Sequence, residues 1–370
     1  MQRVSLPFLQ AGMMVAKGVY SSDGRLLLSA GTILAEGTIP KMQNLGVGSV
    51  YICNPLFTDL EVPELINIDT RVKTIQALQS VVRKFEKTNE LNIEPLKGAV
   101  RQLVAEIISN REAMIHLIDL RTFDDYLIAH SVNVCILSLL TAVNMDYNEA
   151  KLVDLAMGCL LHDLGMTAVP EEIRAKVGSL TPKESSIVQT HAEVGFNYIR
   201  KVRDMSVLAA HVAFQHHERF DGKGYPRQMA GNEIHEYARI AAVADIFDAL
   251  ISDRPYRKGM LPHEAYEILM TLGDSLVDRE IVNIFLEHVA IYPMGSVVQL
   301  GSNEIGIVTT VLPKMQSRPI VKLLTDTNGE LLQEPREINL AEHLTLFITR
   351  VLKEQEIFEL GKSVRDEQES

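Results

Sequence analysis

The middle of the chain constrains the fold more than any other part. From about residue 111 to 291, apolar residues recur almost without interruption at helical spacing, and several of the predicted helices are apolar around much of their circumference. Helices of this kind pack against one another in a compact bundle. The run Thr181-Pro182-Lys183-Glu184 predicts the start of one of them, with a capping threonine, a proline and a capping-box glutamate. The middle is therefore predicted to be all α.

Both ends of the chain have a different pattern. The first 55 residues contain short apolar runs between turn signals, including a predicted hairpin around Asp23-Gly24 and a short helix at 39–45. After Tyr292-Pro293, short apolar runs and the turn at 326–329 predict a small β-barrel or sheet. The predicted fold class is multi-domain α+β, with a central all-α helical bundle flanked by small β-rich N- and C-terminal segments.

These patterns divide the chain into five parts. Two amphipathic helices are predicted at about 69–89 and 95–109, and nothing in them suggests chemistry, so we interpret them as a connector or a pair packed on the next domain. The last residues are charged and polar and are expected to fray. The predicted parts are a β-rich domain at 1–55, a linker with connecting helices at 56–110, the helical domain at 111–291, a small β-rich domain at 292–363, and a tail at 364–370.

The charge and the cysteines exclude several classes of protein. A net charge of -12 argues against binding to polymeric nucleic acid or anionic lipid, although local metal ions can still attract a small phosphorylated ligand. Cys53, Cys135 and Cys159 form no CxxC pair, which argues against a disulfide framework or a zinc-thiolate site. We see no signal peptide and no run approaching about 18 apolar residues. A cytoplasmic protein without a membrane span is expected.

Histidine and aspartate residues in the helical region carry the chemical information. Such side chains are costly to bury unless they are paired, hydrogen-bonded or bound to metal. His130 or His191 alone would more often be a satisfied core histidine, whereas the adjacent pair His162-Asp163 can address two metals through consecutive ligands. Five imidazoles and two carboxylates together favour iron, manganese or cobalt over magnesium or calcium. The candidate ligands are His130, His162, Asp163, His191, His216, His217 and Asp245.

Three segments of this region resemble the HD-GYP family. The stretch His216–Pro226, HHERFDGKGYP, resembles the family signature HHExxDGxGYP, and Leu161–Gly165 resembles its HD motif. The segment Ala244–Lys258 is similar to the family's second aspartate segment. The motifs occur in the family's order and span roughly residues 124–288, about half of the chain. The resemblance implies a helical bundle with a two- or three-metal site that hydrolyses cyclic di-GMP.

The resemblance also implies roles for the candidate ligands. His130, His162, Asp163 and Asp245 are expected to hold one metal. Asp163, His191, His216 and His217 are expected to hold the other, with Asp163 as the bridge and the catalytic residue. A hydroxide between the metals would attack phosphorus, because two metals lower the pKa of a water and stabilise the developing charge.

Two further segments are expected to contact the substrate. The loop Gly224-Tyr225-Pro226 should shape the substrate cleft, the alternative being that it is only a tight connection. Arg254, Arg257 and Lys258 are candidates for phosphate or guanine contacts, the alternative being solvated charges at the end of a helix.

The sequence departs from the family pattern at two positions. Met166 stands where the family's HDxGK motif has lysine, and losing one charged contact could cost about 2–4 kcal/mol of transition-state stabilisation. Another cation, Lys176 or Lys223, could substitute for it. Tyr126 stands where three-metal members have glutamate, so we expect two divalent metals, iron or manganese.

The expected function is hydrolysis of cyclic di-GMP, or a related 3′,3′-cyclic dinucleotide, to the linear dinucleotide, GMP or both. The alternative is a degenerate receptor that binds the nucleotide without efficient turnover because of Met166. A third hypothesis, another metal-dependent phosphohydrolase, fits the HD motif but not the GYP segment. The cyclic dinucleotide is the expected partner, and a homodimer or a signalling protein partner is compatible with the sequence.

Overall fold

The chain divides into two compact units. A computed structural model describes residues 1–21, 25–45, 47–54, 60, 65–112, 114, 126–252, 259–312 and 314–369. One unit comprises 64–113 and 125–288, and the other comprises 1–63, 114–124 and 289–370. The first is helical and the second contains the sheets, so the predicted fold class is confirmed. The five predicted domain boundaries stay predictions.

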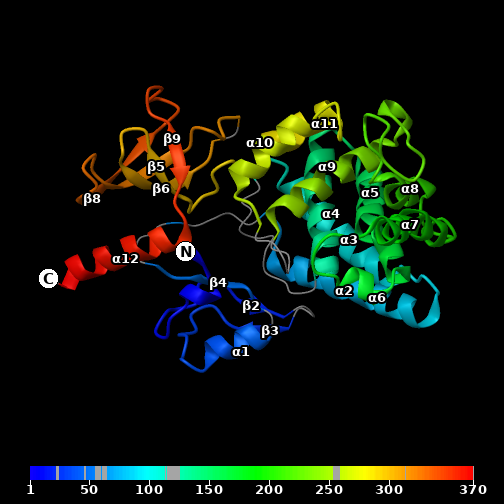
Figure 1. The fold of residues 1–370 in the computed structure, drawn as a ribbon, viewed down its shortest axis with the longest axis horizontal. Coiled ribbons are helices and arrows are strands. Elements are labelled where there is room, and N and C mark those ends of the chain that lie inside the picture. The colour runs from blue at the N-terminus through cyan, green and yellow to red at the C-terminus, as the bar shows by residue number, and fades with distance from the viewer. Residues whose placement is uncertain are drawn as a thin grey trace. The chain divides into compact units, whose positions relative to one another are not determined.

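The described part of the helical unit contains helices and 3₁₀ turns and no strand (Figure 1). They are α2 (Ile68–Thr88), α3 (Glu94–Ser109), α4 (Tyr126–Asn144), α5 (Glu149–Leu161), η4 (Leu164–Ala168), α6 (Glu171–Arg174), α7 (Pro182–Ile199), α8 (Val207–Gln215), η5 (Gly231–Glu233), α9 (Glu236–Ile251), α10 (Pro262–Leu272) and α11 (Arg279–Glu287).

Helix α4 is the central helix of this unit. It contacts α2, α3, α5, α9 and α11, and it contains no charged residue apart from a histidine. A helix without a polar face is stable only when other helices cover it on all sides. The segment Leu127–Asn144 is long and apolar enough to span a membrane, but 83% of it is buried inside the protein, as in the core helix of a bundle. The cytoplasmic location stays a prediction.

Helices α2 and α3 lie close to their predicted positions and belong to the same compact unit as the other helices. The apolar face of α2 packs into the bundle, where Phe85 meets Tyr198 of α7 edge to face at 4.7 Å between ring centroids. The guanidinium of Arg71 donates a hydrogen bond to Asn133 of α4. The amphipathic pattern indicated a buried face without indicating which surface would cover it.

The capping box predicted at the start of α7 is confirmed. The Thr181 side chain accepts a hydrogen bond from the Glu184 backbone N–H at 3.3 Å, and the Glu184 carboxylate accepts one from the Thr181 N–H at 2.6 Å. The box satisfies two backbone donors at the helix start and so fixes where α7 begins.

The N-terminal part of the other unit contains two small antiparallel pairs. Strand β1 (Gln2–Ser5) pairs with β4 (Ser49–Ile52), and β2 (Val19–Tyr20) pairs with β3 (Leu26–Leu28). The turn of the predicted hairpin at Asp23-Gly24 lies outside the described residues. The short turn η1 (Leu6–Phe8) and helix α1 (Thr38–Asn44) complete this part, and α1 agrees with the predicted short helix.

The C-terminal part of that unit is a five-stranded antiparallel sheet in the order β8-β7-β6-β5-β9. Val298, Val308, Val321 and Leu323 are buried in its core. The chain then continues as helix α12 through residues that we expected to be a frayed tail. The Glu356 carboxylate accepts the Lys353 N–H at 2.9 Å and so caps the start of this helix. The strands are β5 (Val297–Leu300), β6 (Ile305–Thr310), β7 (Ile320–Thr325), β8 (Leu331–Asn339) and β9 (Ile348–Val351), and α12 spans Glu354–Glu369.

Candidate metal centre

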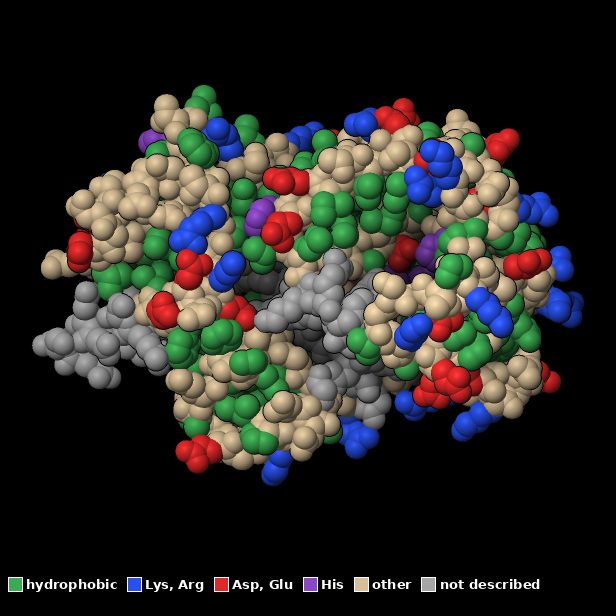
Figure 2. Space-filling model, in the orientation of Figure 1, with side chains coloured by type: hydrophobic (Ala, Val, Ile, Leu, Met, Phe, Trp, Pro, Cys, Tyr) green, Lys and Arg blue, Asp and Glu red, His purple; other side chains and the backbone are tan. Residues whose placement is uncertain are grey.

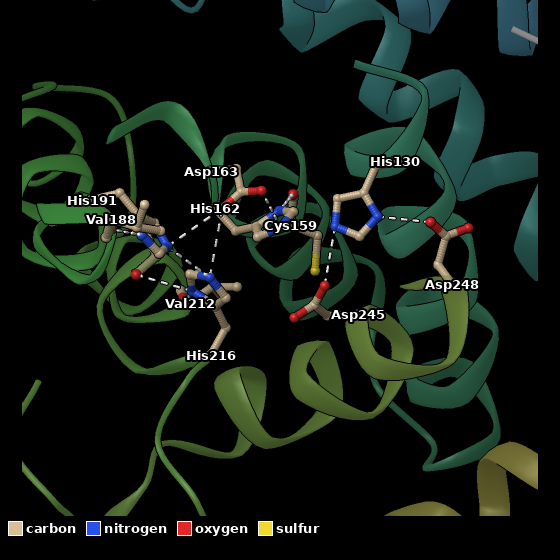
Figure 3. Close-up of polar contacts among 11 residues, drawn as sticks. His130, Cys159, His162, Asp163, Val188, His191, Val212, His216, Asp245 and Asp248 are labelled. Carbon is tan, nitrogen blue, oxygen red and sulfur yellow. Dashed lines mark hydrogen bonds and ion pairs between the residues drawn. The ribbon is translucent and has the colours of Figure 1, made fainter. Parts of the chain in front are cut away.

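The structure brings the candidate metal ligands together inside the helical unit. They come from α4, the end of α5, α7, the end of α8, and α9 (Figure 3). Their ligand atoms form two groups, and within each group all of these atoms lie within 4.8 Å of one another. The His191 group consists of Asp163, His191, His216 and His217, and the His130 group consists of His130, His162 and Asp245.

Three of the histidines have their protonation fixed by their own helices. Each directs its ring Nδ1 at a backbone carbonyl three or four residues earlier, and a carbonyl oxygen can only accept, so Nδ1 carries the proton. The contacts are His162 Nδ1 to Cys159 O at 2.7 Å, His191 Nδ1 to Val188 O at 2.6 Å, and His216 Nδ1 to Val212 O at 3.0 Å (Figure 3). In the neutral rings, each Nε2 is therefore a bare lone pair.

These lone pairs converge in a way that fits a metal ion. His191 Nε2 and His216 Nε2 lie 3.3 Å apart, although neither has a proton to donate while its ring is neutral. Burial and the neighbouring imidazoles lower the pKa of His216 well below its usual value, so its own ring stays neutral at neutral pH. His162 Nε2 is buried without a hydrogen-bond partner. Nitrogen donors placed like this, with Nδ1 held by hydrogen bonds, are typical of metal-binding histidines.

Asp163 faces both groups with different oxygens. Its Oδ1 lies 3.5 Å from His191 Nε2 and 3.7 Å from His216 Nε2, and its Oδ2 lies 3.5 Å from His162 Nε2. Burial raises the pKa of Asp163, but four nearby imidazoles, those of His162, His191, His216 and His130, lower it more, and the net pKa is far below the usual range. The side chain is 18% exposed, so an ionised carboxylate can be reached from solvent.

The His130 group is held by a chain of contacts across three helices. His130 Nε2 lies 3.0 Å from Asp245 Oδ1, and its Nδ1 lies 2.7 Å from Asp248 Oδ2 (Figure 3). The other oxygen of Asp248 accepts a hydrogen bond from Asn133 Nδ2 at 2.8 Å, and Asn133 accepts one from Arg71. Burial lowers the pKa of His130, but its hydrogen bonds to the two carboxylates outweigh this and hold it well above its usual value.

Asp248 is a residue that we did not predict from the sequence. It is fully buried, and its contact with His130 Nδ1 is the kind of carboxylate–histidine pair that orients a metal ligand. The signal was present, since Asp248 follows Asp245 by three residues in an apolar helix and so lies on the same side. A buried carboxylate there needs a partner as much as Asp245 does.

Two glycines permit close backbone contacts at the centre. A Cβ at Gly165 would lie 2.0 Å from the carbonyl oxygen of His191, so the turn after Asp163 can approach α7 only as glycine. A Cβ at Gly224 would lie 2.3 Å from the Arg219 backbone nitrogen, so the GYP loop folds tightly onto the segment after α8.

The GYP loop places an aromatic ring beside the His191 group. The Tyr225 ring centroid lies 4.8 Å from that of His217 and 6.3 Å from that of His191. Burial and the charges of Asp163 and Asp245 raise the pKa of Tyr225, so its hydroxyl stays protonated. Gly224 is buried and Pro226 is exposed in this loop.

The next residues of the loop are held from within by a buried carboxylate. Glu218 accepts hydrogen bonds from the Arg227 N–H at 2.6 Å and the Met229 N–H at 3.0 Å. The glutamate of the HHE motif therefore stabilises the loop by hydrogen bonds and is not part of either ligand group.

Of the cations that we expected to contact the substrate, Arg254, Arg257 and Lys258 lie outside the described residues. Met166 is half-buried, and of its two suggested substitutes, Lys176 is paired with Glu184 at 2.6 Å. Lys223 is 76% exposed and lies 3.7 Å from Asp221. Neither lysine is a free charge at the centre.

The space-filling view shows histidine and acidic side chains together in a hollow on the face of the helical unit, surrounded by apolar and polar side chains (Figure 2). The buried imidazoles and the partly exposed carboxylates of the two ligand groups are consistent with such an opening.

Comparisons with known proteins agree with this geometry. A family model described as an HD domain matches residues 103–281. The chain is 33% identical over 255 residues to a cyclic di-GMP phosphodiesterase of Pseudomonas aeruginosa, which covers 69% of this chain and 61% of the relative. It is 37% identical over 159 residues to a cyclic di-GMP phosphodiesterase of Thermotoga maritima, covering 43% of each chain. The chain belongs to the HD-GYP family.

Three further matches to this HD-GYP protein concern another relative, a solved structure and the C-terminal sheet. A 3′3′-cGAMP-specific phosphodiesterase of Vibrio cholerae is 37% identical over 129 residues, covering 35% of this chain and 25% of the relative. A solved HDG"Y"P protein from Bdellovibrio bacteriovorus has the same fold, with a TM-score of 0.52 at 19% identity, covering 76% of this chain and 97% of the other. A model described as a KOW domain associated with HD domain matches residues 297–360, the region of the five-stranded sheet.

The chain spans less than two thirds of the length of these curated relatives. The HD domain family is metal-dependent, and the two ligand groups described above could bind metal.

Proposed function

We propose that this protein is a metal-dependent phosphodiesterase that hydrolyses a cyclic dinucleotide, cyclic di-GMP or a related 3′,3′-cyclic dinucleotide, to the linear dinucleotide, GMP or both. The observation that carries the proposal is the convergence of imidazole Nε2 atoms whose Nδ1 protons are held by carbonyls, on both sides of one ionised carboxylate. The names of the relatives support the choice of substrate.

In this proposal, the two ligand groups each hold one divalent ion, iron or manganese. Asp163 contributes one oxygen to each group and acts as the bridge and the catalytic residue. The ions would supply a water of lowered pKa and positive charge at the phosphate. The metal ligands are His130, His162, Asp163 and Asp245 for one ion, and Asp163, His191, His216 and His217 for the other.

Other residues act on the substrate directly. The Tyr225 hydroxyl keeps its proton and donates a hydrogen bond to the nucleotide, while Gly224 and Pro226 shape the loop that presents it. Arg254, Arg257 and Lys258 are proposed to contact phosphate or guanine, as the family resemblance implies.

The test uses anaerobically purified protein of known metal content, incubated with cyclic di-GMP or 3′3′-cGAMP, with and without Fe(II) or Mn(II). We expect metal-dependent formation of linear dinucleotide or mononucleotides, resolved by chromatography. Asp163→Ala should abolish it, and Asp204→Ala, which removes an exposed carboxylate from the same unit, should not. Turnover that persists in Asp163→Ala would contradict the proposal.

Met166 favours a second candidate, a receptor that binds the nucleotide without efficient turnover. No cation stands at this position, and methionine cannot contact a phosphate by charge. Tight binding of intact cyclic di-GMP without product would support the receptor. A large gain in rate in Met166→Lys, with unchanged binding, would show that the natural enzyme is weakened by this residue.

A further inference from the structure

A cavity of about 210 Å³ opens beside the metal centre, within the helical unit. Its wall includes Asp163, whose carboxylate faces both ligand groups, and Met166, the position at which the family motif has lysine. Much of the remaining wall is apolar and comes from α2, α4 and α5. The space next to the expected reaction centre is therefore bounded by helix α2, in which the sequence pattern suggested no chemistry.

Two arginines line the same cavity. Arg83 comes from α2 and Arg174 from the end of α6, and both are exposed. Neither guanidinium forms an ion pair with any residue that the structure describes, whereas Lys176, two residues beyond Arg174, is bound to Glu184 at 2.6 Å. Glu86 also lines the cavity and is the one further carboxylate besides Asp163 among the lining residues. Two guanidiniums that have no ion pair among the described residues thus line the space that Met166 leaves without a cation.

Helix α2 is held firmly enough to position Arg83. Its Arg71 donates to buried Asn133, which in turn donates to Asp248 behind His130. Phe85, two residues after Arg83, packs edge to face on Tyr198. The same helix is therefore tied to the metal centre at one end and carries a guanidinium into the neighbouring cavity near the other.

We propose that Arg83 and Arg174 form a phosphate-binding subsite that supplies the positive charge missing at position 166. This inference rests on the proposed function and names the part of the substrate that the cavity takes. Guanidiniums bind phosphate oxygens in pairs and are less strongly hydrated than ammonium groups, so two of them replace a lysine effectively. At about 210 Å³ the cavity is smaller than the roughly 300–1,000 Å³ of typical ligand pockets, so it takes part of a cyclic dinucleotide and not the whole.

The test replaces both arginines by methionine, which keeps an unbranched side chain and removes the charge. Two probes are titrated by calorimetry: cyclic di-GMP with metal-loaded protein, and pyrophosphate with protein stripped by a chelator. We expect the double variant Arg83→Met/Arg174→Met to bind both probes about tenfold more weakly or worse, because each charged contact is lost. Glu86→Gln should change affinity in the opposite direction, since it removes a negative charge from the same wall.

The matched control is Arg101→Met/Arg203→Met, which makes the same change in net charge at two exposed positions outside the lining residues. It should bind both probes as the wild type does, and the metal content and circular dichroism of all variants should be unchanged. Equal weakening in the control would show a general charge effect and overturn the subsite. Binding within twofold of wild type in the Arg83/Arg174 double variant would overturn it as well, as would wild-type protein that binds neither probe. Wild-type protein that binds pyrophosphate through these arginines but neither binds nor hydrolyses cyclic di-GMP would leave the subsite standing and remove the proposed function.

Discussion

The two ligand groups of the metal centre differ in what holds their histidines. In the His191 group, the Nδ1 atoms of His191 and His216 are satisfied by carbonyls of their own helices. In the His130 group, His162 is held in the same way by the Cys159 carbonyl, but His130 relies on Asp248, which is 118 residues away, and through it on Asn133 and Arg71. The orientation of the His191 and His216 rings follows as soon as their own helices form, whereas that of His130 needs three helices to pack. The two groups should therefore respond differently to substitution, protons and chelators.

The largest effect should come from Asp163, which belongs to the His191 group and also faces His162 of the His130 group. Asp163→Asn keeps the shape of the side chain and removes the charge that faces His162, His191 and His216. We expect loss of metal from both groups and a fall in activity of about a thousandfold or more. Metal analysis after gel filtration and a turnover assay measure this, with Asp204→Asn as the control. A variant that keeps one full equivalent in each group would show that the groups do not share this carboxylate.

Asp248→Asn should separate the groups. The amide that replaces the carboxylate can no longer accept from both His130 and Asn133, so the imidazole loses its orientation. Loss of such a supporting carboxylate typically lowers metal affinity by about 10–100-fold. We expect the ion of the His130 group to leave at a lower chelator concentration, while the ion of the His191 group stays.

Metal content measured across a chelator series checks the Asp248→Asn prediction, because the two ions should leave at two different chelator concentrations. The folded state is checked by thermal unfolding in parallel, with Asp204→Asn again as the control. Simultaneous loss of both ions at the same chelator concentration would contradict a difference in how the groups are held.

Protons should also distinguish the groups. Metal binding requires a neutral imidazole, so protons compete with metal wherever the pH lies below the pKa of that imidazole. Burial lowers the pKa of His217 to about 4, whereas contacts with Asp245 and Asp248 outweigh burial and raise that of His130. As the pH falls, the His130 group should release its ion before the His191 group does. Metal content after equilibration from pH 8 to pH 4.5 measures the order, and release in the reverse order would contradict it.

The smallest effect is expected at Met166. If Arg83 and Arg174 already provide the positive charge in the cavity, Met166→Lys adds little, and we expect a change in kcat of less than about threefold. In the background of the Arg83→Met/Arg174→Met double variant, the same lysine should restore more activity than it adds to the wild type. Steady-state kinetics on the four proteins gives the coupling, and a gain that is equal in both backgrounds would show that lysine and arginines act independently.

The sequence predicted the helical bundle, the β-rich ends and the candidate ligands because these depend on local patterns. Apolar spacing in α4, the capping box at Thr181 and the His162-Asp163 pair are all visible within a few residues. The role of α2 was not visible in this way. Its apolar face indicated burial. The role of Arg71 depends on its contact with α4, and that of Arg83 depends on the cavity that it lines together with Asp163 and Arg174 of α6.

Asp248 and the C-terminal helix show the same limit. Asp248 was within a segment that resembles the family, but its partner His130 is on another helix, and no spacing rule connects them. The sequence of helix α12 is mostly charged and polar. A local pattern of that kind is compatible both with a solvated tail and with a surface helix. A contact between distant segments decided the first case.

The chain of contacts from Arg71 to His130 gives the metal centre a place in the order of folding. During translation Arg71 is synthesised first, His130 and Asn133 follow, and Asp248 is synthesised more than a hundred residues later. The His191 group can take its shape from helices that lie close together in the chain, but the His130 group is complete only when α2, α4 and α9 have docked. An ion retained by that group would then report correct assembly of the bundle, and a protein loaded in one group alone would mark a chain whose last step of packing had failed.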